Sequence, residues 1–161
     1  MSRYLIRRAR LLGGAPTDIY LEDGVVAALD GDLAARAVDG DVEVVEADGL
    51  VALPGLVDLH THLREPGRED AETVESGTRA AALGGFTAVH AMANTDPVAD
   101  TAGVVEQVWR LGREAGHCDV FPVGAVTVGL AGERLAELGA MADSAARVRV
   151  FSDDGRCVSD P

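Results

Sequence analysis

Apolar and polar residues alternate over the first third of the chain. Short alternating runs cover residues 4–12, 18–29 and 41–49, and such runs are typical of strands with one buried face. The triplet Glu22-Asp23-Gly24 divides the second run and has the composition of a hairpin turn. The pattern therefore predicts a small β domain over residues 1–52.

From Leu53 onward, apolar runs alternate with Ala-rich segments that have helical spacing. The pattern predicts strands at 51–62, 86–94, 118–129 and 147–155, and helices at 72–85, 100–116 and 133–145. This order is typical of β-α units around a parallel sheet, so we expect an α/β fold. Four such units are half of a TIM-type (β/α)8 barrel, which assigns residues 53–161 to the first half of a barrel.

Half a barrel leaves two strand edges open, and natural folds cover such edges. We therefore expect either that a partner covers them or that the chain is a fragment of a longer protein.

Composition and charge narrow the function classes. The 161 residues carry 14 basic and 27 acidic side chains, for a net charge of -13, which disfavours nucleic-acid and anionic membrane partners. No apolar segment reaches the length of a membrane span, and the N-terminus lacks the apolar stretch of a signal peptide. We expect a cytoplasmic protein. Cys118 and Cys157 have no CxxC spacing, so a disulfide framework or thiolate zinc site has little support.

The clearest chemical signature is an HxH motif at the end of the first apolar strand. In a strand, residues two apart point to the same face, so His60 and His62 can bind one cation. Asp58 precedes them on that face, where it could orient an imidazole through its second ring nitrogen. Arg64 follows on the same face if the strand geometry persists.

Further ligands must come from other strand ends. The fourth predicted strand ends in Asp153-Asp154-Gly155. Asp154 shares the parity of the apolar Val148 and Val150, which favours it over Asp153 as the ligand. The alternative is that both aspartates belong to an ordinary turn. Asn94 ends the second strand in the same way, and turn chemistry alone would explain it.

Taken together, these motifs resemble the dihydroorotase family within the amidohydrolase superfamily. The resemblance rests on PGLVDLHTHLREPG, ESGTRAAALGGFT, MANTDP and FSDDG, which occur in the family's order. It implies that residues 1–52 are part of an accessory β-sandwich. It also implies that His60, His62 and Asp154 bind one or two zinc ions, and that Arg64 and Asn94 hold a substrate carboxylate.

The resemblance further implies zinc-dependent, reversible hydrolysis of dihydroorotate to carbamoyl-aspartate in pyrimidine synthesis, with a homo-oligomer or aspartate carbamoyltransferase as possible protein partners. Other family members use a carboxylated lysine as a ligand at the end of strand four, and this sequence has no lysine. Another cyclic amidohydrolase, such as an allantoinase or hydantoinase, and a non-catalytic scaffold subunit stay open as alternatives. The family's proton-shuttle aspartate is expected beyond Pro161, so the isolated chain should not be a competent catalyst.

Overall fold

The structure is a computed structural model and describes residues 2–30, 33 and 41–159. It divides into two compact units, Met1–Pro54 and Gly55–Pro161. The division lies two residues after the position at which the hydrophobic pattern changes.

The first unit is a five-stranded sheet. Its central strand, β1 (Arg3–Leu11), pairs antiparallel with β2 (Pro16–Glu22), which pairs antiparallel with β3 (Val25–Leu29). On its other edge β1 pairs in parallel with two short strands in succession, β4 (Glu43–Glu46) and β5 (Val51–Ala52). Two small clusters of side chains are buried on this sheet: Leu5, Tyr20 and Leu33, and Ala9, Ile19 and Ala47.

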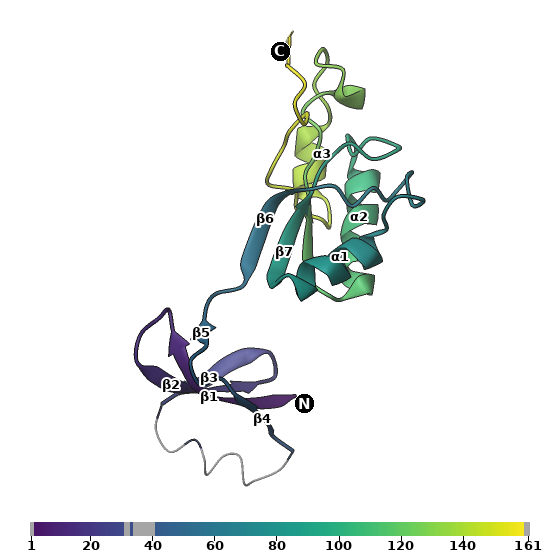
Figure 1. The fold of residues 1–161 in the computed structure, drawn as a ribbon. Helices are drawn as coiled ribbons and strands as arrows, with labels where there is room; N and C mark the ends of the chain where they lie inside the picture. The colour runs from purple at the N-terminus through teal and green to yellow at the C-terminus, as the bar shows by residue number, and fades with distance from the viewer. Residues whose placement is uncertain (1, 31–32, 34–40, 160–161) are drawn as a thin grey trace. The chain divides into compact units, whose positions relative to one another are not determined.

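The second unit alternates strands and helices. A three-stranded parallel sheet has the order β6 (Leu56–Thr61), β7 (Phe86–Ala91), β8 (Asp119–Pro122). Helix α1 (Val74–Leu83) connects β6 to β7, and α2 (Ala102–Ala115) connects β7 to β8. The two helices pack against each other, α1 against β7 and α2 against β8 (Figure 1). Together these elements confirm an α/β arrangement with parallel strands.

Local sequence explains where the two long helices begin and end. The Thr73 hydroxyl caps α1 by accepting the backbone N–H of Ser76. In turn, the Ser76 hydroxyl accepts the backbone N–H of Thr73. Helix α2 ends at Ala115 and is capped by Gly116, whose φ of 68° is the left-handed conformation that glycine adopts readily. Gly112 lies against Val120 of β8, where a Cβ would approach within 2.5 Å. Glycine at this position therefore allows α2 to lie close to the sheet.

The second unit has two apolar clusters. One lies between the helices and the sheet and contains Leu63, Val74, Val89, Ala91, Val108 and Val120. The other lies where α2 meets the chain beyond β8, and its largest fully buried side chain is Met141. Burial of these side chains fixes the strand ends from which the polar residues project.

The predicted strand 51–62 is wrong as one element. Its first residues form β5 in the first unit, and β6 begins only at Leu56. Pro54 has no N–H to donate to a ladder, and Gly55 lies so close to Thr87 that a Cβ would come within 2.1 Å of its methyl carbon. The backbone therefore passes from one unit to the next at these two residues.

Three further predictions need correction. The strand predicted at 118–129 ends at Pro122, and a single 3-10 turn covers Val128–Leu130. The helix predicted at 133–145 is shortened to α3 (Leu138–Asp143), because residues 134–136 bond back to residues 126–128. The fourth strand, 147–155, is present only as a parallel bridge between Gly124 and Phe151. Left-handed φ angles at Arg147 and Asp154 interrupt extended backbone at both ends of that segment.

Within the described residues, no helix combines the length and apolar character that crossing a bilayer requires.

Candidate metal centre

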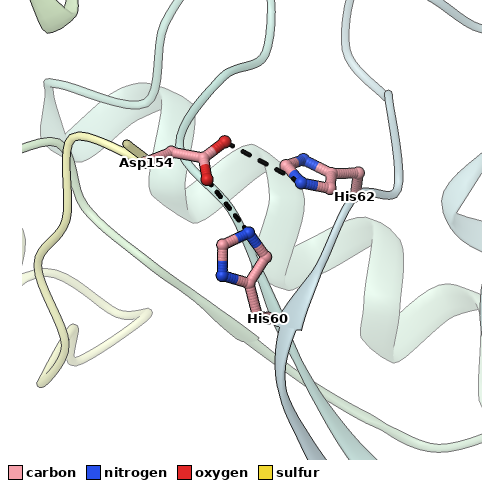
Figure 2. A group of neighbouring side chains, drawn as sticks. All are labelled: His60, His62 and Asp154. Atoms are coloured by element: carbon pink, nitrogen blue, oxygen red, sulfur yellow. Dashed lines mark ion pairs between the residues drawn. The ribbon is translucent and has the colours of Figure 1, made fainter. Parts of the chain in front are cut away.

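Three side chains from distant parts of the second unit converge at one end of its sheet. His60 lies near the end of β6, His62 follows that strand, and Asp154 comes from the segment that bridges to Gly124. Figure 2 shows both imidazoles pointing towards the Asp154 carboxylate. His60 Nε2 lies 2.9 Å from Asp154 Oδ1, and His62 Nε2 lies 3.8 Å from Oδ2. The structure thus brings together the three predicted ligands.

The donor set fits a divalent metal such as zinc. Two ligand atoms of a tetrahedral zinc ion, each about 2.0–2.1 Å from the metal, lie about 3.4 Å apart. The two histidine–aspartate distances fall on either side of this value, and one ligand atom from each residue lies within 4.8 Å of the others. Imidazole nitrogen and carboxylate oxygen are common zinc ligands. The three residues are therefore close enough together to hold one ion between them.

The local backbone explains why the histidines lie side by side. The Asp58 carboxylate accepts the backbone N–H of His60 at 3.0 Å, and the pairing of β6 with β7 is irregular between Asp58 and Thr61. The two rings are in edge contact, with centroids 5.1 Å apart. Asp58 therefore bonds to main chain. The expectation that it orients an imidazole is wrong in this structure.

The ring nitrogen of His62 that faces away from Asp154 has a different partner. Nδ1 lies 3.0 Å from Asn94 Oδ1, in the loop that follows β7. The residue pattern alone is explained by turn chemistry at Asn94, and the family resemblance implies a substrate contact, but nothing in the sequence indicates a contact with His62. The pairing appears only when the two strand ends are placed next to each other.

The two adjacent aspartates have separate roles in the structure. Asp153 is 4% exposed, and its carboxylate accepts the backbone N–H groups of Val126 and Thr127 at 2.8 and 3.0 Å, together with the Thr127 hydroxyl. Thr127 in turn accepts the N–H of Gly132 at 2.8 Å. Only Asp154 reaches the histidines. Parity along a regular strand had favoured the same residue, although the segment is not a regular strand.

Arg64 does not join the row of histidines. It has a left-handed φ of 63°, so the alternation of β6 does not continue through it. Its side chain is exposed, and among the described residues it makes no hydrogen bond or ion pair. Backbone contacts nevertheless join its loop to that of Asn94: Asp96 N–H donates to Pro66 O at 2.9 Å, and Gly67 packs directly on Asp96. The loops that carry Arg64 and Asn94 are thus neighbours.

Comparison with known proteins identifies the family. Residues 49–160 match the family described as dihydro-orotase-like, and the chain belongs to that family. It is 69% identical over 160 residues to a dihydroorotase of Streptomyces coelicolor, covering 99% of this chain and 36% of that protein. It is 57% identical over 158 residues to a dihydroorotase of Mycobacterium tuberculosis, with 98% and 36% covered. The chain therefore spans about a third of the length of these relatives.

Two solved structures share the fold of this chain. An L-hydantoinase from Arthrobacter aurescens superimposes with a TM-score of 0.66 at 25% identity, covering 81% of this chain and 29% of that one. A β-aspartyl dipeptidase from Fervidobacterium islandicum gives a TM-score of 0.64 at 18% identity, with 99% and 44% covered. The second likeness shows a shared fold alone.

Proposed function

We propose that the complete protein is a zinc-dependent dihydroorotase and that this chain supplies three ligands of its metal centre. The cluster of His60, His62 and Asp154 carries the proposal, because it combines a zinc-compatible donor set with membership of the dihydro-orotase-like family. The high identity to two dihydroorotases supports the same reaction. On this proposal the second unit belongs to a (β/α)8 barrel, and the first unit belongs to an accessory β-sandwich.

On this proposal, different residues of the chain bind the metal and the substrate. A bound zinc ion supplies Lewis-acid chemistry, which activates water and polarises an amide carbonyl. The two histidines and Asp154 hold the ion near the carboxyl ends of the parallel strands, where barrel enzymes have their active sites. The Arg64 side chain is exposed and makes no hydrogen bond or ion pair with a described residue, so its guanidinium is free to form two charge-assisted hydrogen bonds with the carboxylate of dihydroorotate. Asn94, in the neighbouring loop, would orient the same group.

The reaction is best tested on the complete gene product. We expect the purified protein to contain zinc, to hydrolyse dihydroorotate and to close the ring of carbamoyl-aspartate. His60→Ala should lose both the metal and the turnover. His117→Ala is a matched control, because His117 pairs with Glu75 at 3.1 Å, outside the cluster. Full turnover in zinc-free protein, or in His60→Ala, would overturn the proposal.

The substrate class needs a separate comparison. A hydantoinase acts on a ring without the carboxylate of dihydroorotate, so it gains nothing from an Arg64 clamp. The superposition on an L-hydantoinase makes this the relevant alternative. We expect Arg64→Gln to raise the KM for dihydroorotate by about 10-fold or more, as the loss of a hydrogen bond between charged groups predicts. Faster turnover of hydantoin than of dihydroorotate would favour the alternative.

A further inference from the structure

The two ring nitrogens of His62 face different chemical groups. Nε2 lies 3.8 Å from the Asp154 carboxylate, on the side where the cluster converges. Nδ1 lies 3.0 Å from the side-chain oxygen of Asn94. His60 has no comparable hydrogen bond from its second ring nitrogen to any described residue. Among the described residues, His62 therefore has a hydrogen-bond partner for the ring nitrogen that faces away from the cluster, and His60 does not.

This partner is suited to one tautomer of His62, the one that can bind a metal through Nε2. A neutral imidazole carries one N–H and one lone pair, and a metal binds only the lone pair. If Nε2 is the ligand atom, the proton must be on Nδ1, and Nδ1 then needs a hydrogen-bond acceptor. The amide oxygen of Asn94 is such an acceptor. Groups that accept from the second nitrogen of a ligand histidine orient the ring and strengthen metal binding.

The backbone on either side of Asn94 is well anchored. Ala93 is fully buried, and its carbonyl accepts the N–H of Ala99 at 3.0 Å. The N–H of Asp96 donates a hydrogen bond to the carbonyl oxygen of Pro66 in the neighbouring loop. The amide of Asn94 thus projects from a short segment that is fixed on both sides.

The second half of the Asn94 amide is available for another ligand. Its Nδ2 makes no hydrogen bond to any described residue, and the side chain is exposed. An amide can accept through its oxygen and donate through its nitrogen at the same time. We propose that Asn94 is a positioning residue for His62: its side-chain oxygen holds His62 in the metal-binding tautomer. This inference rests on the proposed metal site.

Two substitutions separate the two halves of the amide. Asn94→Leu removes both the acceptor and the donor with little change in size. Asn94→Asp keeps an oxygen for His62 but removes the donor and adds a negative charge. Gln107→Leu makes the same amide-to-apolar change on α2, which contributes no side chain to the cluster. Each variant is made in the complete gene product, and zinc affinity is measured by chelator competition without substrate.

We expect Asn94→Leu to weaken zinc binding by about 10- to 100-fold, the usual cost of removing a group that orients a ligand. Asn94→Asp should bind zinc at least as tightly as the wild type, and Gln107→Leu should match it. In zinc-loaded protein, Asn94→Asp should bind carbamoyl-aspartate about 10-fold more weakly or worse, because it lacks the donor and repels the carboxylate. If Asn94 had only a structural role, zinc binding would be weakened in Asn94→Asp as it is in Asn94→Leu.

Failure of this inference differs from failure of the proposed function. If the wild type binds no zinc, the metal site itself is wrong. If the wild type binds zinc and Asn94→Leu binds it equally well, the metal site stands and the role of Asn94 is overturned.

Nitrogen-15 NMR of the metal-free protein gives an independent measurement. We expect the neutral His62 ring to carry its proton on Nδ1 in the wild type and to lose this preference in Asn94→Leu. A wild-type ring protonated on Nε2 would overturn the inference.

Discussion

The two sides of the metal cluster are held in place by different means. We call the end of β6, with His60 and His62, the histidine side. Here main-chain pairing with β7 continues to Thr61, and the Thr61 carbonyl accepts the N–H of Met92 at 2.9 Å. The aspartate side is residues 147–154, which has one isolated bridge to Gly124 and depends on the buried carboxylate of Asp153.

This difference assigns separate tasks to residues that look alike in the sequence. On the histidine side, backbone pairing of β6 with β7, although irregular between Asp58 and Thr61, positions the ligands, and polar side chains only adjust them. On the aspartate side one carboxylate organises the backbone so that the next one can face the histidines. Substitutions on the two sides should therefore change different properties of the protein, and the magnitude of their effects should also differ.

The largest effect should follow Asp153→Ala, which leaves two backbone N–H groups and a hydroxyl, each at least partly buried, without an acceptor. Each such group costs about 1–3 kcal/mol, so we expect a local loss of about 3 kcal/mol or more. Hydrogen exchange at the Val126 and Thr127 amides should accelerate about 100-fold. Asp154→Ala is the matched control and should leave these amides protected. Equal acceleration in both variants would remove the distinction between the two aspartates.

The second effect concerns zinc. A ligand present at 100 times its dissociation constant adds about 2.7 kcal/mol to the stability of the folded state. We expect zinc to raise the midpoint of thermal unfolding of the wild type, and a chelator to reverse this. In Asp154→Ala most of the rise should disappear, because one of the three ligands is missing. An unchanged rise would show that the aspartate side does not contact the metal.

A smaller effect is expected from Thr127→Val. The hydroxyl of Thr127 bonds to Asp153 and accepts the N–H of Gly132, and valine has the same shape without it. The loss should be about 1–2 kcal/mol, seen as faster exchange of the Gly132 amide. Thr127→Ser restores the hydroxyl and should restore most of the protection. If serine behaves like valine, packing of the methyl group matters more than the hydrogen bonds.

The smallest effect should come from Asp58 on the histidine side. Asp58→Ala removes the acceptor for the His60 N–H, which predicts a loss of about 1 kcal/mol because the strand pairing remains. Asp58→Asn keeps an acceptor and should be close to neutral. Zinc affinity, measured by chelator competition, should change little in either variant. A loss of zinc as large as that in His60→Ala would mean that Asp58 orients an imidazole after all.

Part of the fold could be predicted from the sequence because the governing interactions are local. Alternation of apolar residues located the strands of the first unit, and helical spacing located α1 and α2, whose caps in the structure are Thr73 and Gly116. Strand ends were less accurate, because residues 123–136 and 147–155 bond to distant partners such as Ala99 and Gly124 rather than to a regular neighbouring strand. No local pattern encodes those partners.

The sequence by itself determined which residue types can bind a metal: two histidines with strand spacing, a pair of aspartates after an apolar run, and no lysine to offer another ligand. Only the tertiary structure decided that Asp154 faces the histidines, that Asp153 holds the backbone, that Asp58 bonds to main chain, and that Asn94 lies behind His62. Ligand chemistry is a property of single side chains. Direction and hydrogen-bond partner depend on backbone segments that are far apart in the chain and meet only in the folded protein.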